Sequence, residues 1–220
     1  MNNKIIAVVG ANGKMGSLLT KKLCSDYCII KITEDNSLYN YKNIDLVVDF
    51  ANANSSIKST KYCSQNKIPI LIASTGQTKQ ELEEIKSFSS KIPIMICQNL
   101  SLGIGILKQM ILPILNQKNI DITILEKHHK EKKDKPSGTA KMLHDFILKK
   151  TNTTAEIISE RGGKEVGQHT IDFYFGNELI SITHQAYSRE IYVDGAILAI
   201  KFLLNDLSPR IYTFDEILNL

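Results

Sequence analysis

The stretch Lys4-Ile-Ile-Ala-Val-Val-Gly10-Ala-Asn-Gly13-Lys-Met-Gly16 decides how the first part of the chain folds. Its first six residues are an apolar, β-branched run typical of a buried strand, and the glycines that follow are spaced Gly-x-x-Gly-x-x-Gly. A glycine turn between a strand and a helix is the arrangement of a dinucleotide site, where backbone amides approach a pyrophosphate. The usual spacing is Gly-x-Gly-x-x-Gly, so a glycine turn without a ligand is the alternative interpretation.

Further strands alternate with helices in this part of the chain. The segment Thr78-Lys-Gln-Glu81 has the form of a capping box and predicts a helix that buries Leu82, Ile85 and Phe88. The alternation predicts a Rossmann-like parallel sheet with helices on both faces. The other strands are predicted over four apolar runs: Cys28–Thr33, Asp45–Phe50, Pro69–Ala73 and Pro93–Cys97.

The second half of the sequence has a different pattern. Gly176-Asn177 lies between two alternating runs and predicts a two-residue hairpin turn. Hairpin-linked strands indicate an α+β domain with an open mixed or antiparallel sheet. We therefore expect a dinucleotide-binding domain over 1–98, with the tail 205–220 packed back on it, and a second domain over 99–204. Its strands are expected at Ile120–Ile124, Glu156–Ser159, Gln168–Phe175 and Glu178–Tyr187, and its helices at Gly103–Asn116, Thr139–Lys150 and Gly195–Leu204.

The composition is that of a soluble globular protein. The 220 residues are 43% hydrophobic and 23% charged, with a net charge of +4 that says little about partners. No stretch approaches the ~18–20 apolar residues of a membrane span, so we expect no membrane partner. The four cysteines lack metal-ligand spacing and are interpreted as free thiols in the cytoplasm, and we assign no metal site.

The segment Glu126-Lys-His-His-Lys-Glu-Lys-Lys-Asp-Lys-Pro-Ser-Gly-Thr-Ala140 is rich in lysine. Residues 127–150, which overlap it, hold eight lysines against three acids and so carry most of the positive excess of the chain. It has three interpretations: a solvated basic loop, a nucleic-acid patch, or an anion site for a small dicarboxylate. The nucleic-acid interpretation is disfavoured because no interleaved aromatic residues or binding motif are present. Ser137 is a natural N-cap whose following amides, at Gly138 and Thr139, are suited to a carboxylate. Histidine is the side chain best suited to proton transfer near neutral pH.

These motifs resemble the 4-hydroxy-tetrahydrodipicolinate reductase (dihydrodipicolinate reductase) family of lysine and diaminopimelate biosynthesis. The pattern E-x-H-H-x-x-K-x-D-x-P-S-G-T-A over 126–140 is the most specific part of the resemblance, which runs almost from end to end. The resemblance implies an NAD(P)H-dependent oxidoreductase acting on a small dicarboxylate, with a C-terminal substrate-binding domain that forms a homotetramer. The other matching motifs are Gly10–Gly16, Ala73-Ser-Thr-Gly76, Gln98-Asn-Leu-Ser-Leu-Gly103, Arg161-Gly-Gly163, Val166-Gly-Gln-His-Thr170, Ile182-Thr-His184, Ser188-Arg189 and Tyr212-Thr-Phe-Asp-Glu-Ile-Leu218.

The resemblance also implies roles for individual residues. His128 falls on the catalytic acid/base of the family and Lys132 on its catalytic lysine; which of the two protonates the substrate stays open, with His128 favoured. Substrate-binding positions fall on His129, Ser137, Gly138 and Thr139. Cofactor-binding positions, for NADH, NADPH or both, fall on Gly10, Ala11, Asn12, Gly13, Lys14, Met15, Glu34, Ala73, Ser74, Thr75, Cys97, Gln98, Asn99 and Leu100.

Several residues have more than one interpretation. Glu34 or Asp35 would hold the adenosine ribose and favour NADH over NADPH, while Lys14 would partly offset this by meeting a phosphate. The chain is short for the family between Asn36 and Asp45, and Gln77 stands where an aromatic residue is frequent. Arg161 and His169-Thr170 either line the substrate cleft or satisfy strand ends. The functional alternatives are another two-domain dehydrogenase, such as one acting on an amino-acid semialdehyde, or a nucleotide-sensing or nucleic-acid-binding module without turnover.

Overall fold

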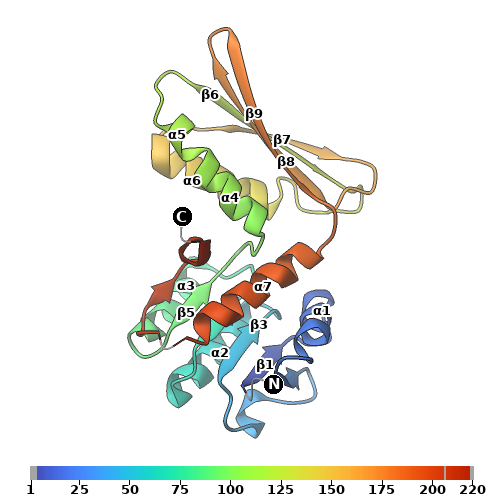
Figure 1. Cartoon of the computed structure of the whole chain (residues 1–220), viewed down its shortest axis with the longest axis vertical. Helices are drawn as coiled ribbons and strands as arrows, with labels where there is room; N and C mark the ends of the chain where they lie inside the picture. Colours follow the sequence, from blue (N-terminus) through green and yellow to red (C-terminus); the bar gives the residue numbers. More distant parts are fainter. Residues whose placement is uncertain (1–3, 206, 219–220) are drawn as a thin grey trace. The chain divides into compact units, whose positions relative to one another are not determined.

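The computed structural model describes residues 4–205 and 207–218, and divides the chain into two compact units (Figure 1). The first unit comprises Met1–Leu100 with Tyr192–Leu220, and the second comprises Ser101–Ile191. Among the described residues, no helix combines the length and the apolar character that crossing a membrane requires.

The first unit contains a six-stranded, fully parallel sheet in the order β10-β5-β4-β3-β1-β2. Alternate residues of each strand face opposite sides of the sheet. One side packs against α1 and α7, and the other against α2 and α3. The Rossmann-like prediction is confirmed. The strands are β1 Ile5–Val9, β2 Cys28–Ile32, β3 Leu46–Asp49, β4 Ile70–Ile72, β5 Ile94–Ile96 and β10 Ile211–Tyr212; the helices are α1 Lys14–Leu23, α2 Ala53–Asn66, α3 Lys79–Ser87 and α7 Glu190–Leu203, with short 3-10 helices at Leu38–Asn40, Phe88–Ser90 and Phe214–Leu218.

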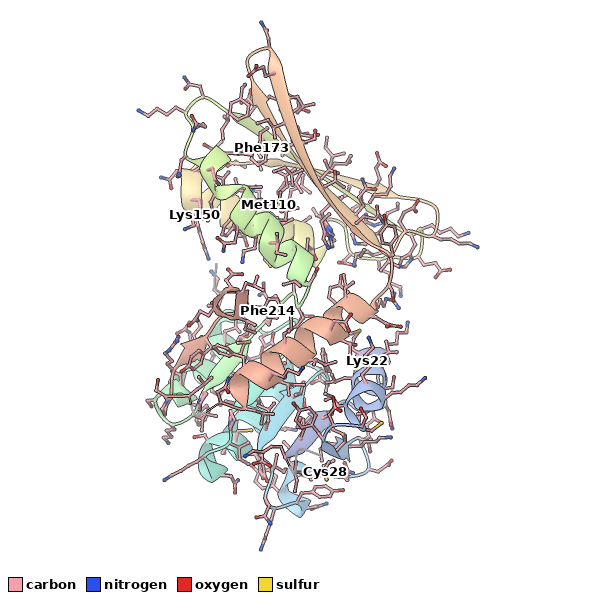
Figure 2. The ribbon with its side chains drawn as sticks, in the orientation of Figure 1. Lys22, Cys28, Met110, Lys150, Phe173 and Phe214 are labelled. Atoms are coloured by element: carbon pink, nitrogen blue, oxygen red, sulfur yellow. The ribbon has the colours of Figure 1, made fainter. Side chains whose placement is uncertain are left out.

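The second unit contains a four-stranded mixed sheet in the order β7-β6-β8-β9. The β6–β7 pair is parallel, and the other two pairs are antiparallel. Its core lies between the sheet and its helices, and Phe173 of β8, labelled in Figure 2, is fully buried in it. The strands are β6 Asp121–His128, β7 Glu156–Arg161, β8 Gly167–Phe175 and β9 Glu178–Ala186; the helices are α4 Leu102–Met110, α5 Leu112–Leu115 and α6 Gly138–Thr151.

Two local predictions are confirmed and one is corrected. Thr78 and Glu81 form the reciprocal capping box, and Gly176 adopts a φ of 58° in the turn that joins β8 to β9. The single helix expected over 103–116 is instead two helices that meet at Ile111. Pro113 explains the break, because its ring removes a backbone N–H donor at this point.

From Tyr192 onward helix α7 groups with the first unit, whereas residues up to 204 were predicted to lie in the second domain. Its buried residues Val193 and Ile200 lie in the same core cluster as Leu19 of α1. A Cβ at Gly195 would lie only 1.7 Å from the carbonyl oxygen of Leu100, so glycine is what permits this close approach. The tail that follows α7 adds β10 to the edge of the first sheet, beside β5.

Candidate active site

The glycine turn after β1 has the backbone geometry of a phosphate site. Gly10 adopts a φ of 77°, and a Cβ there would lie 2.9 Å from Cα of Ala51. A Cβ at Gly16 would lie 2.2 Å from the carbonyl oxygen of Gly10, so this glycine lets α1 pack closely on the turn. Helix α1 begins after Gly13 without a side-chain cap and without acidic residues in its first turn. Its first amides therefore suit an anion.

A cavity of about 580 Å³ brings the glycine turn together with the end of β2. Gly10, Asn12 and Gly13 line one part of it, and Glu34 and Asp35 line another. Glu34 and Asp35 are both exposed, so their carboxylates can reach a ribose. Lys14 is exposed at the first position of α1. These residues fit the pyrophosphate and ribose of a dinucleotide.

The other predicted cofactor residues follow β4 and β5 at the same carboxyl edge of the sheet. The amides of Ala73 and Ser74 donate to the carbonyl oxygen of Asp49 at 2.9 and 3.0 Å. Gln77 stabilises this loop, because its Nε2 donates to the carbonyl oxygen of Ser74 at 3.1 Å. The carboxyl edge of a parallel sheet is where ligands of such folds bind. The segment Cys97–Leu100 follows β5, and the Cys97 thiol donates to the carbonyl oxygen of Asn99 at 3.0 Å.

Asp49 is a buried carboxylate that was not predicted as part of the site. Its oxygens accept hydrogen bonds from the Ala51 amide at 3.0 Å and from the hydroxyls of Ser55 and Ser59 at 2.8 and 2.7 Å. Burial raises the pKa of Asp49, against the effect of these donors. The contacts fix the turn on which Gly10 packs.

In the second unit, β6 carries an acid–base pair at its carboxyl end. The buried face of β6 presents Ile122, Ile124, Glu126 and His128 in succession. Oε2 of Glu126 lies 2.5 Å from Nδ1 of His128. Oε1 of Glu126 accepts from the Arg161 guanidinium at 2.7 Å and from the Ser137 amide at 3.2 Å. A carboxylate with no exposed surface is thus fully hydrogen-bonded.

The charges of this cluster set its protonation. Burial acts to raise the pKa of Glu126, yet the hydrogen bonds from Arg161 and His128 lower it to about 2. Glu126 is therefore ionised at neutral pH. Burial lowers the pKa of His128, and Glu126 acts in the opposite direction. Arg161 also donates to the carbonyl oxygen of Asp134 at 2.6 Å, so it links Glu126 to the basic loop, residues 129–137 between β6 and α6.

His169 of β8 stands opposite Glu126 in the β6–β8 register. Its ring meets that of His128 edge to face, with centroids 5.3 Å apart. Its Nε2 lies 3.2 Å from Oγ of Ser137, which also accepts from the Ala140 amide as the N-cap of α6. Burial lowers the pKa of His169 to about 3, so the ring is neutral near pH 7.

The basic loop and the start of α6 hold the predicted substrate residues. Lys132 pairs with Asp134 at 2.7 Å, and the His129 amide donates to the carbonyl oxygen of Glu165 at 2.9 Å. Burial acts to raise the pKa of Asp134, but Lys132 and hydrogen bonds to the backbone of Asp134 itself and of Gly138 lower it. Gly138 is exposed and Thr139 is partly exposed at the first turn of α6. Ser137 caps α6 as predicted; it is also buried, and its hydroxyl accepts from the Ala140 amide of the helix.

Three side chains here have atoms of the type that bind metals. Glu126, His128 and His169 each place one such atom within 4.8 Å of the others. However, Arg161 and His128 already use both oxygens of Glu126, and the guanidinium would repel a cation. We therefore interpret the three residues as a hydrogen-bonded acid–base cluster.

A dinucleotide-binding parallel-sheet unit joined to a second unit with a buried acid–base cluster defines a class: two-domain oxidoreductases that use a nicotinamide nucleotide. Residues 26–100 match the N-terminal part of the dihydrodipicolinate reductase family, and residues 103–218 match its C-terminal part. The chain belongs to this family.

Individual relatives agree with this family membership. The 4-hydroxy-tetrahydrodipicolinate reductase of Wigglesworthia glossinidia brevipalpis is 36% identical over 97% of this chain and 92% of the relative. That of Clostridium tetani is 34% identical over 97% and 96%. A dipicolinate-bound dihydrodipicolinate reductase from Paenisporosarcina sp. TG-14 superposes with a TM-score of 0.81 over 96% of this chain and 97% of that one. Its identity is 18%, so this last likeness concerns the fold.

Proposed function

We propose that this chain reduces 4-hydroxy-tetrahydrodipicolinate to tetrahydrodipicolinate with NADH or NADPH, in lysine and diaminopimelate biosynthesis. The observation that carries the proposal is the buried Glu126–His128 pair, followed within the same segment by Lys132 and the exposed start of α6. The pair supplies a proton, and the lysine and helix start bind carboxylates. The names of the full-length relatives support the same reaction.

The residues of the second unit then have distinct tasks. When bound, the dihydronicotinamide supplies a hydride. Loss of water from the substrate leaves a conjugated cyclic imine, and a ring carbon must gain a proton to complete the reduction. His128 delivers this proton, while Lys132 and the amides of Gly138 and Thr139 bind the two carboxylates. A positioned acid typically contributes ~10²–10⁴-fold to such a step. Overall, one reduced nucleotide and one proton are consumed and one water is released.

The first unit holds the nucleotide in this proposal. The segment 10–15 binds the pyrophosphate, and Glu34 binds the ribose hydroxyls. Ala73–Thr75 and Cys97–Leu100, after β4 and β5, hold the nicotinamide and its ribose. Because an acidic group disfavours a 2′-phosphate, we expect kcat/KM to be higher with NADH than with NADPH. Glu34→Gln should narrow this preference, and equal kcat/KM values for the wild type would contradict the role of Glu34.

Turnover is tested by following NADH and NADPH oxidation with freshly generated product of dihydrodipicolinate synthase. We expect turnover with at least one nucleotide, and none with an amino-acid semialdehyde. His128→Gln and Lys132→Ala should each lower kcat by about 10²-fold or more and leave nucleotide binding near normal. Nucleotide binding without turnover of the wild type would refute the proposed function and favour a sensing module. A fully active His128→Gln would refute the proton donor.

We also propose a homotetramer in the cytoplasm, with no nucleic-acid partner. The β7, β8 and β9 strands expose large apolar side chains, which suits an interface between copies. Sedimentation velocity at micromolar concentration should give about four times the 24.7 kDa chain mass. A monomer at all concentrations would contradict this assembly. The exposed side chains are Ile158, Tyr174, Leu179 and Ile180.

A further inference from the structure

We propose that Glu126 is the positioning residue of the reaction: together with Arg161 it fixes the His128 ring so that Nε2, and only Nε2, exchanges the proton. This inference rests on the proposed function for its kinetic consequence. Its structural content, the tautomer of His128, can be measured without turnover.

The geometry leaves Glu126 no freedom to turn. The period of β6 puts Glu126 and His128 on one face, two residues apart, where the carboxylate oxygen Oε2 meets Nδ1 at 2.5 Å. The other oxygen, Oε1, is held by donors from two different elements: Arg161 at the end of β7 and the amide of Ser137 before α6. A rotation of the carboxylate, which has no exposed surface, would break three hydrogen bonds.

An ionised carboxylate accepts hydrogen bonds and donates none. Nδ1 of His128 must therefore carry the hydrogen of the bond to Glu126, in both the neutral and the protonated ring. The proton that comes and goes is then on Nε2. No hydrogen bond joins Nε2 to any residue that the structure describes. A Cβ at Gly167 would lie 2.8 Å from Nε2, so the absence of a side chain there gives this nitrogen its room.

Arg161 keeps Glu126 ionised, which its positioning role requires. Burial alone would raise the pKa of Glu126 and favour the protonated carboxyl, which could donate to Nδ1 and reverse the tautomer. The guanidinium 2.7 Å away is the strongest opposing contact. The charged and titratable groups that face His128 are Glu126 on its own strand, Arg161 from β7, His169 from β8 and Lys132 from the basic loop; among them only the Glu126 charge favours the protonated ring.

Glu126→Gln tests the inference, because it keeps the shape of the side chain and changes its bonding. The amide oxygen of glutamine satisfies the two donors, Arg161 and the Ser137 amide, and the NH₂ group then faces Nδ1. Nδ1 becomes an acceptor, and the hydrogen of the neutral ring moves to Nε2. Loss of the negative charge also lowers the pKa of His128. Glu160→Gln is the matched control, since the Glu160 side chain lies on β7 and pairs with the partly exposed Lys127.

In the kinetic arm, kcat is measured against pH at saturating NADH. We expect kcat at pH 7.5 to be lower by about tenfold or more in Glu126→Gln than in the wild type. The fall in kcat at high pH should also be displaced to lower pH. Activity should therefore recover partly on acidification. KM for NADH and the Glu160→Gln profile should be unchanged. A Glu126→Gln enzyme with the wild-type pH profile and a uniform loss of activity would show a merely structural role and overturn the inference.

In the structural arm, the ring ¹⁵N shifts of His128 are recorded by NMR and assigned with His128→Gln. We expect a hydrogen on Nδ1 in the wild type at neutral pH, and on Nε2 in Glu126→Gln. A wild-type ring with its hydrogen on Nε2 refutes the inference even if Glu126→Gln does not fold. Failure of the proposed function is seen separately, as a wild type that binds NADH but does not turn over; in that case the NMR arm alone decides on the positioning of His128.

Discussion

Gly167→Ala adds a methyl group to β8. This substitution tests whether the position of the His128 ring limits kcat. The new Cβ would lie 2.8 Å from Nε2 and 3.2 Å from Cδ2 of His128. Ordinary contacts between such atoms begin at about 3.4–3.5 Å, so the ring must move by about 0.6 Å. Its Nδ1 is held at 2.5 Å by Glu126, which resists the movement. The strain therefore falls on the proton donor itself.

The size of the effect follows from this displacement. A misplacement of about 1 Å costs about 10²-fold in rate, so we expect kcat to fall by about ten- to a hundredfold. Overpacking costs roughly 1–3 kcal/mol of unfolding free energy, and replacing glycine by alanine recovers roughly 0.4–1 kcal/mol through the unfolded chain. The variant should thus stay folded, with a stability lower by about 1–2 kcal/mol.

The assay is kcat at saturating substrate and NADH, with stability measured by urea unfolding of the same preparations. Gly162→Ala is the matched control, because nothing lies within 4 Å of the Cβ that it adds. We expect it to keep wild-type kcat. If Gly167→Ala keeps wild-type kcat as well, the position of His128 does not limit the reaction and the reasoning fails.

Three further predictions follow from individual contacts. Gly10→Ala should weaken NADH binding by at least about tenfold, measured by calorimetry, because Ala51 blocks the added Cβ and φ is positive; unchanged affinity would contradict the phosphate site. The pKa of His169 is about 3 when folded and ~6.5 when unfolded, so the unfolded state binds more protons and stability falls as the pH drops below ~6.5. Between pH 7 and pH 5, His169→Gln should remove about 2 kcal/mol of the loss in unfolding free energy. An unaltered dependence of the unfolding free energy on pH would show that His169 does not cause this loss. Asp134→Asn should lower the substrate KM up to about fivefold by freeing Lys132 from a partly exposed pair, whereas a raised KM would mean that Asp134 orients Lys132.

The first unit is predictable from local pattern, because each strand is an apolar run and each run is bounded by a polar turn. What the pattern misses is β10, since Ile211–Tyr212 is too short to show a period. It also cannot tell which sheet α7 covers. The apolar face of α7 is visible in the sequence, but its contact with Leu19 and its approach to Leu100 are long-range facts. A helix is therefore easier to predict from the sequence than the sheet on which it packs.

The site was predictable where its residues lie together in the sequence, as in the segment 126–140. The prediction ended the strand at Ile124, whereas β6 continues to His128. Extending the alternation by two steps would have placed Glu126 and His128 on the buried face, and a buried glutamate demands a cation. Arg161 and His169 could not be chosen as its partners from the sequence, because the register of β7 and β8 against β6 decides them.

That register explains why the acid–base cluster stands at the end of β6 and nowhere else along it. In the middle of the strand, Ile124 faces Ile157 and Ile171 across the two neighbouring strands, and the surroundings are apolar. At its end, His128 is paired with Arg161 on the parallel side, while Glu126 is paired with His169 on the antiparallel side. A carboxylate moved two residues back would be buried without a donor, at a cost of several kcal/mol. The strand end is thus the first position where the sheet offers Glu126 a guanidinium, a backbone amide and an imidazole together, and this is what lets His128 carry a titratable proton inside a folded core.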